Sequence, residues 1–126
     1  MIDVSTLDCI TTRWRNDATN FDALLESGLV DTISTDFAGG HWDGILEAIH
    51  RIVRKKQLAA PAAIALATGN VARVFPQLAG DRGLIERGKR ADIVVADSAN
   101  LSRVRDVLIA GRVVVRNGRI LWRRLR

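Results

Sequence analysis

Residues 36–43 carry the side chains of this sequence that are best suited to chemistry. Asp36 directly follows an apolar, β-branched run at residues 30–35, and His41 and Asp43 come soon after it. Carboxylate oxygens and imidazole nitrogens are ligands for divalent metals, zinc among them, and both groups act as general acids or bases. The pattern predicts either a metal or acid–base site, or a strand-end aspartate that caps the following turn.

The loop after Asp36 has two possible roles, a substrate-binding segment or a plain surface turn. Gly39 and Gly40 permit backbone conformations that other residues avoid, which suits a close approach to a substrate as well as a plain turn. His41 and Trp42 either contact that substrate or form a surface loop with an aromatic anchor. The second histidine, His50, lies between apolar helix-forming residues and is predicted to be an ordinary helix-face residue.

Length and composition describe one folded domain that carries excess positive charge. The chain has 126 residues, 48% of them hydrophobic, and no apolar run long enough to span a bilayer. One cysteine and an N-terminus without signal-peptide character predict a cytoplasmic protein. Residues 1–81 carry seven Lys/Arg and ten Asp/Glu, whereas residues 82–126 carry twelve and four. The arginines are scattered through strand-like segments, so solvated strand faces are favoured over a nucleic-acid site, and no membrane partner is expected.

The first part of the chain alternates short strands and helices. A doubtful strand at 2–4 and a clear one at 29–35 flank a helix at 21–27 that Gly28 ends. Three helices follow, with predicted starts at an Asp43 N-cap, at Pro61 and at an Asn70 N-cap. Two strands cannot close a parallel barrel, so the strand at 29–35 requires neighbours that this stretch does not provide.

The second part, from about residue 80, is a series of short strands separated by glycines. Strands are expected in "GLIERG", "ADIVVAD", "VRDVLIAG", "RVVVRNG" and "RILW". Asn117-Gly118 is a strong signal for a two-residue hairpin turn. Asp92 and Asp97 flank one of these strands and are expected to close turns.

These segments together resemble the C-terminal part of the amidohydrolase superfamily. "GLIERGKRADIVVAD" at 83–97 matches its G-x-I-x-x-G-x-x-A-D-[IL]-V pattern, and "VRDVLIAGRVVVRNGRI" matches its closing hairpin. "LAAPAAIALATGNVARVF" is similar to the helices that join the barrel to this β-module, and "DTISTDFAGG" fits the end of the last barrel strand. The resemblance covers about residue 28 to the end.

The resemblance implies an α/β fold in two units. Residues 1–79 would be the last βα units of a (β/α)₈ barrel, and residues 80–126 the C-terminal strands of its accessory β-sandwich. It also implies hydrolysis of a non-peptide C–N bond in a small amide, cyclic amide or amine substrate. Asp36 would contact a divalent metal, most simply zinc, and shuttle a proton, while Gly39, Gly40, His41 and Trp42 would lie at the substrate.

The sequence departs from the family pattern in its other metal ligands. Its two histidines, His41 and His50, form no His-x-His motif, and a catalytic zinc normally has three protein ligands. We therefore expect a truncated product, an expressed fragment or one part of a split enzyme. We expect the isolated chain to hold no metal cofactor, and its own activity stays open. The alternative function is an inactive module that associates with itself, as a homo-oligomer, or with a complementing chain through exposed strand edges.

Overall fold

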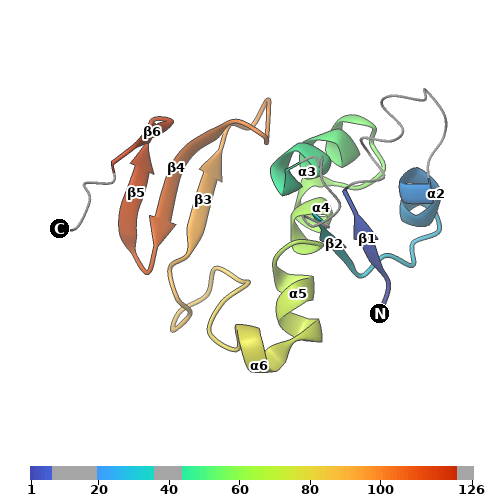
Figure 1. Ribbon diagram of the computed structural model, residues 1–126, viewed down its shortest axis with the longest axis horizontal. Helices are drawn as coiled ribbons and strands as arrows, with labels where there is room; N and C mark the ends of the chain where they lie inside the picture. Colours follow the sequence, from blue (N-terminus) through green and yellow to red (C-terminus); the bar gives the residue numbers. More distant parts are fainter. Residues whose placement is uncertain (7–19, 36–43, 122–126) are drawn as a thin grey trace.

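The computed structural model of the chain describes residues 1–6, 20–35 and 44–121. A part built mostly of helices stands beside one antiparallel sheet, and helices α4 and α5 lie between that sheet and a pair of parallel strands (Figure 1). The mixed α/β class predicted from the sequence is confirmed. The first part has the order β1 (Asp3–Ser5), α2 (Asn20–Glu26), β2 (Thr32–Ser34), α3 (Ile45–Arg54), α4 (Ala60–Ala65), α5 (Gly69–Val74) and α6 (Pro76–Ala79).

Strands β1 and β2 form a parallel pair with two unlike faces. Their register sets Val4 opposite Ile33, and both side chains are buried in the core. Side chains alternate between the faces of a strand, so Asp3, Thr32 and Ser34 lie on the other face. The doubtful strand of the sequence prediction is thus confirmed, one residue later than expected, as the partner of β2.

Helix α3 covers the apolar face of this strand pair. Its apolar residues recur at helical spacing, and Ala48, Ile49 and Ile52 are buried. Phe21 and Leu25 of α2 and Ala63 and Leu66 near α4 complete the same cluster. The core therefore joins both strands to the helices on one side only.

A buried carboxylate ties α2 to α3. Asp22 accepts hydrogen bonds at 2.8 Å from Arg51 and Lys55 and at 2.9 Å from Gln57. The Arg51 guanidinium also lies 5.6 Å from the centroid of the Phe21 ring. Burial opposes ionisation of this carboxyl, but its three donors outweigh that effect and hold the pKa of Asp22 below its ordinary value of 3.8.

The second part is a four-stranded antiparallel meander in chain order. Its strands are β3 (Ile93–Ala96), β4 (Val104–Ile109), β5 (Arg112–Arg116) and β6 (Arg119–Ile120). Asn117 and Gly118 between the last two strands have φ of 50° and 72°, as a type I′ turn requires. The predicted hairpin is confirmed.

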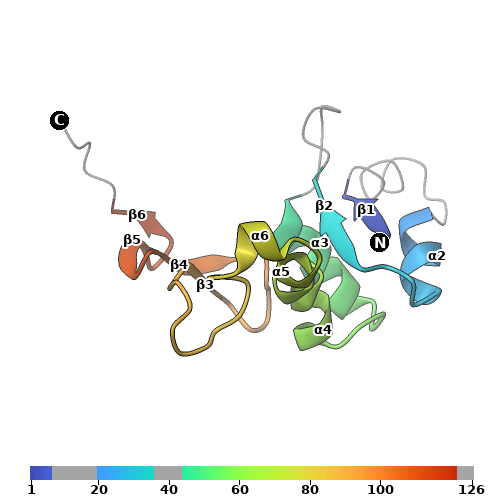
Figure 2. The ribbon, with the colours of Figure 1, turned by 90° about the horizontal axis from the view of Figure 1, so that it is seen from below.

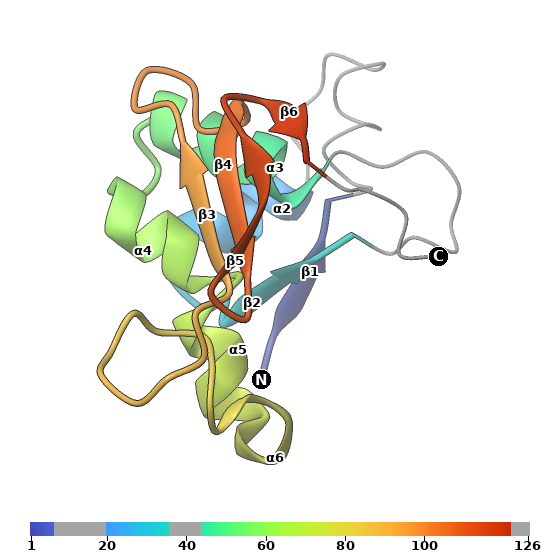
Figure 3. The ribbon, with the colours of Figure 1, turned by 90° about the vertical axis from the view of Figure 1, so that its left-hand side faces the viewer.

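This sheet is a single layer. Figure 3 shows it from its β6 edge, with the strands in front of the helices. No residue from 81 to 121, all of which the structure describes, is buried. Val94, Val107, Val115 and Ile120 pair directly across the four strands, so they form one apolar row on one face. Leu101, between β3 and β4, packs against the helical core.

Several local predictions are wrong. "GLIERG" forms no strand, because Gly83 and Gly88 adopt φ of 90° and 88° and turn the chain. The helix after the glycine loop is preceded by Gly44 at its N-cap instead of Asp43. Thr68, not Asn70, occupies the N-cap of α5, and the chain forms the extra helix α6 after Phe75 because Pro76 suits a first helical turn.

None of the helices in the described ranges is both long enough and apolar enough to cross a bilayer.

Candidate active site

The carboxyl ends of β1 and β2 meet at one edge, since the strands are parallel and adjacent. Chain segments leaving parallel strands at this edge form the active sites of βα folds. Asp36 comes two residues after the end of β2. Asp36 and the predicted loop residues Gly39, Gly40, His41 and Trp42 lie outside the described residues. The structure thus fixes the strand that leads to them.

The polar face of the strand pair contains a network centred on Asp3. Its two carboxylate oxygens accept separate hydroxyl donors from β2, Thr32 Oγ1 at 2.6 Å and Ser34 Oγ at 2.5 Å. The Thr6 amide donates to the Ser34 carbonyl at 2.7 Å and extends the pairing to the last residue of β2. Side chain and backbone together hold the carboxyl end of β2 against β1.

The amino end of β2 is anchored by different contacts. The Ile2 amide donates to the Asp31 carboxylate at 2.9 Å, and the chain's amino group lies 3.8 Å from the same carboxylate. The side-chain amide of Asn70 donates to the Asp31 carbonyl at 2.8 Å, and the Ile33 amide donates to the Leu66 carbonyl at 3.2 Å. The outer edge of β2 is therefore bonded to the turn between α4 and α5.

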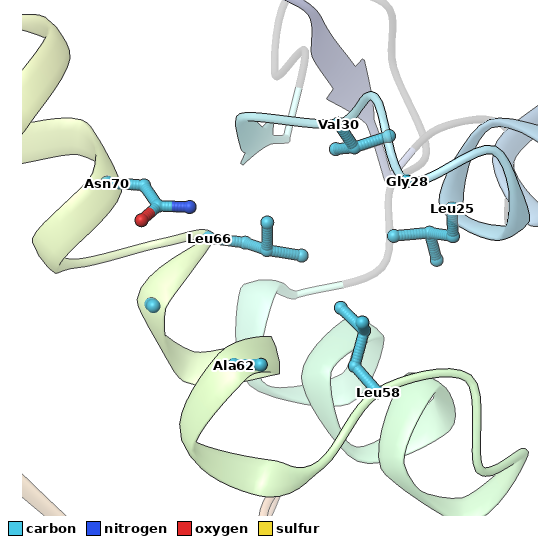
Figure 4. Close-up of a pocket in the computed structure, with 8 residues that line it drawn as sticks. Leu25, Gly28, Val30, Leu58, Ala62, Leu66 and Asn70 are labelled. Carbon is cyan, nitrogen blue, oxygen red and sulfur yellow. The ribbon is translucent and has the colours of Figure 1, made fainter.

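A pocket of about 230 Å³ opens beside the residues that precede β2 (Figure 4). Asn70 is the polar side chain among an otherwise apolar lining of Leu25, Gly28, Val30, Leu58, Ala62, Ala65 and Leu66. Such a wall has no donor set for a divalent metal. The pocket is thus distinct from the predicted site, which follows the other end of the strand.

Metal-binding side chains do not gather elsewhere in the part of the chain that the structure describes. Within 1–6, 20–35 and 44–121 no three His, Cys, Asp or Glu residues are grouped so that they could hold an ion. His50 lies within α3, as predicted. The described residues therefore do not form a metal site by themselves, and Asp36, His41 and Asp43 remain the predicted donors of this chain.

Two aspartates of the sheet close turns, as predicted. Asp92 Oδ1 accepts the Ala110 amide at 2.7 Å, and Asp97 Oδ1 accepts the Ala99 amide at 2.8 Å. These backbone hydrogen bonds lower the pKa of both carboxyls from their ordinary value, with smaller contributions from nearby arginines. Asp92 and Asp97 are thus structural.

Two contacts of the strand pair were not predicted from the sequence. Alternation does place Asp3 on one face of β1, and Thr32 and Ser34 on one face of β2. Only the parallel register brings the carboxylate to both hydroxyls. The hydrogen bond from Asn70 to Asp31 joins residues 39 positions apart, so no local sequence pattern predicts it.

Comparisons with known proteins agree with the resemblance. The sequence profile of the amidohydrolase family matches residues 1–114. Adenine deaminase 2 of Agrobacterium fabrum is 37% identical over 83 residues, which are 66% of this chain and 13% of that protein.

A crystal structure of β-aspartyl dipeptidase from Fervidobacterium islandicum AW-1 superposes with a TM-score of 0.73 at 21% identity, over 100% of this chain and 34% of that one. The complex of that enzyme with β-Asp-Leu dipeptide gives a TM-score of 0.64 at 24% identity, over 82% and 30%. The chain thus spans about a third or less of these relatives. On the family match over most of its length, this protein belongs to the amidohydrolase family.

Proposed function

We propose that this chain provides the last strand carboxylate, Asp36, of a metal-dependent amidohydrolase that hydrolyses a non-peptide C–N bond. The supporting observation is the parallel pair β1–β2, which leads toward Asp36 at the edge where βα folds build active sites. The bond cleaved would be that of an amide, a cyclic amide or a ring amino group. Residues 1–79 would complete a (β/α)₈ barrel, and residues 80–126 would complete its β-sandwich.

The alternation of β2 supports the orientation of Asp36. Thr32 and Ser34 lie on the face away from the helical core. Asp36 follows Ser34 by two residues, the spacing that returns a strand side chain to the same face. In a barrel whose helices lie outside, the face away from the helices is the interior. Continuing the strand by two residues would direct the carboxylate to the interior side.

The carboxylate would act as a proton shuttle. Asp36 would take a proton from the attacking water as a general base and deliver it to the leaving nitrogen as a general acid. A divalent metal, most simply zinc, would lower the pKa of a bound water and polarise the substrate. Asp36 supplies one ligand oxygen of the three that a catalytic zinc needs, so the other ligands would come from the remainder of a barrel.

The loop after Asp36 would meet the substrate. Gly39 and Gly40 would let the backbone approach it, and His41 and Trp42 would offer a hydrogen-bonding and an apolar surface. The names of the relatives, adenine deaminase and β-aspartyl dipeptidase, suggest adenine and β-Asp-Leu as the small molecules to test first. A cytoplasmic setting remains part of this proposal.

A second candidate function is association without catalysis. A single-layer sheet with an apolar row and no buried residue favours it, because isolated sheets need a covering layer to be stable. The partner would be a second copy of this chain or a chain that carries the missing strands.

Zinc titration followed by amide NMR tests the assignment of Asp36. Because one carboxylate does not hold zinc, the titration uses the chimera described below, in which the remaining ligands are present. Zn²⁺ is expected to shift amides around residues 34–38 there, and Asp36→Asn should abolish these shifts. Asp31→Asn is the matched control, because Asp31 lies at the opposite end of the same strand. Zinc shifts that survive Asp36→Asn would contradict the assignment.

Activity is tested in a chimera, in which this chain replaces the matching third of the Fervidobacterium dipeptidase. The chimera is expected to hydrolyse β-Asp-Leu or release ammonia from adenine, and Asp36→Asn should reduce the rate by about a hundredfold or more. Equal rates for the chimera and its Asp36→Asn variant would reject the shuttle role. A folded, zinc-loaded chimera without activity would favour the association function.

A further inference from the structure

The α4–α5 turn region (Leu66–Asn70), which is the turn itself and the first two residues of α5, touches both parts of the molecule. Figures 1 and 2 both place α5 between the β1–β2 pair and the four-stranded sheet. The chain leaves this helical layer through α6 and returns past the turn at residues 83–84 before it enters β3.

On the strand side, the turn region is bonded to the outer edge of β2. Asn70 Nδ2 donates to the Asp31 carbonyl at 2.8 Å, and the Leu66 carbonyl accepts the Ile33 amide at 3.2 Å. These two bonds lie on the edge of β2 that does not face β1. The position of the turn therefore affects the position of β2.

On the sheet side, the same turn packs against the segment that leads into β3. Gly83 has φ of 90°, and a Cβ on it would lie 2.6 Å from the Ala72 Cβ and 3.1 Å from the Thr68 carbonyl oxygen. A Cβ on Gly69 would lie 3.0 Å from Leu84 Cδ2. The two segments therefore approach so closely that neither Gly69 nor Gly83 has space for a Cβ.

We propose that the Leu66–Asn70 turn region couples the sheet to β2, with Asn70 and Gly83 as positioning residues on its two sides. A displacement at Gly83 pushes on Thr68 and Ala72, shifts the start of α5 and strains the bonds to Asp31 and Ile33. Such coupling acts equally in both directions. Its consequence for Asp36, three residues beyond Ile33, rests on the proposed function, whereas the coupling itself does not.

Amide hydrogen exchange of Ile33 measures the coupling in the chain as it exists, without any activity. Gly83→Ala inserts a Cβ against the turn, and Gly88→Ala is its matched control. Gly88 has φ of 88°, nearly the same backbone strain, but a Cβ there meets nothing within 4 Å. Gly83→Ala should accelerate exchange at Ile33 by about tenfold over Gly88→Ala. Equal acceleration in the two variants would overturn the proposal.

A rescue variant separates steric coupling from general loss of stability. Adding Ala72→Gly to Gly83→Ala removes the 2.6 Å contact but leaves the one to Thr68. Exchange at Ile33 should then return part of the way to the wild-type rate. No recovery would show that the clash with α5 is not the route.

Two less disruptive substitutions keep the test decisive if the Gly83→Ala variant does not fold. Leu84→Ala removes the contact with Gly69, and Ile85→Ala is its control because Ile85 is 86% exposed. Leu84→Ala should accelerate exchange at Ile33 about threefold, while Ile85→Ala leaves it unchanged. Leu101→Ala, which removes the packing of Leu101 against the core, tests a competing route. An effect at Ile33 in this variant alone would refute the role of the turn region.

The reverse direction uses Asn70. Asn70→Asp removes the donor to the Asp31 carbonyl, and it should accelerate exchange at the Arg90 amide, which is bonded to the Asp81 carbonyl in the segment before β3. Asn100→Asp is the control, because Asn100 serves as an acceptor and keeps that ability. Equal exchange rates of the Arg90 amide in the Asn70→Asp and Asn100→Asp variants would contradict coupling in this direction.

Failure of this proposal and failure of the proposed function are distinguishable. Asp36→Asn should leave the exchange at Ile33 and Arg90 unchanged, whatever the zinc titration shows.

Discussion

The two parts of the chain bury their apolar side chains to very different extents. In the first part, a cluster of residues from both strands and three helices is buried below one tenth exposure, with Ile52 and Phe21 fully covered. In the sheet, Ile120 is 76% exposed and Val94 is 51% exposed. Because apolar burial drives folding, the first part holds its own tertiary structure and the sheet depends on local pairing.

The largest effect in a test of this contrast comes from truncating a buried and an exposed isoleucine side chain to alanine. Ile52→Ala should reduce the free energy of unfolding by about 2–5 kcal/mol, since Ile52 is fully buried in α3. Ile109→Ala in β4, where the side chain is 51% exposed, should cost below about 1 kcal/mol. Urea unfolding followed by circular dichroism measures both, and equal costs would show that the sheet has a core.

The next largest effect concerns the buried ion cluster of the first part. Asp22→Ala leaves Arg51 and Gln57 without their shared acceptor and should cost about 2 kcal/mol, reduced by the partial exposure of Lys55. Asp81→Ala, which breaks an exposed pair with Arg82 near the sheet, should change the unfolding midpoint little. A similar midpoint for both variants would contradict the contrast.

The pH dependence of stability sharpens the same point. The pKa of Asp22 is lowered on folding, so its stabilising effect is present above the ordinary value of 3.8 and is lost as the pH falls through the folded-state value. Urea midpoints of the wild type and Asp22→Asn should therefore differ at pH 7 and converge below pH ~3.8. A constant difference down to pH ~2 would mean that Asp22 does not titrate with folding.

A smaller effect is expected in the hairpin of the sheet. Gly118 has φ of 72°, and a Cβ there would lie at an ordinary contact distance of 3.7 Å from the Val104 carbonyl oxygen, so Gly118→Ala should cost about 1 kcal/mol through backbone strain. Gly44→Ala, at the start of α3 with φ of −60° and no neighbour within 4 Å, is the control. The lower unfolded-state entropy of alanine offsets its poorer N-cap, so stability should change by less than about 0.5 kcal/mol. Thermal unfolding of the two variants compares them.

The smallest effect on stability, and a separate one on association, is expected from the apolar row of the sheet. Ile120→Lys should leave the melting temperature nearly unchanged, because the side chain is 76% exposed. If the row covers a second copy, the variant should shift sedimentation toward the mass of one chain. Wild-type protein that sediments as one chain at high concentration would rule out self-association and leave a complementing chain as the partner.

The elements with strong local signals were predictable from the sequence. The α3 periodicity, the Asn117-Gly118 turn and the strands around Val94 and Val107 each depend on residues close in the chain. The prediction of a strand in "GLIERG" was wrong because Gly83 and Gly88 adopt positive φ and turn the chain. The strand-like pattern of apolar residues does not show this.

The contacts that position β2 were not predictable, because they are long-range. Asp3 reaches Ser34 only through the parallel register, and Asn70 reaches Asp31 only after the helices pack. The sequence predicted the residues of the candidate site, from Asp36 to Trp42. These lie outside the described residues, so their roles stay predictions.

The hydroxyl network on β1–β2 has a consequence for solvation. A serine or threonine hydroxyl has one proton to donate, and Thr32 and Ser34 both give theirs to Asp3. Thr32 is buried, so it is the less buried Ser34 hydroxyl that can still offer lone pairs to a molecule entering from this face. The face will therefore attract water hydrogens, amide N–H groups and ammonium ions, and it will disfavour carboxylates and carbonyl oxygens.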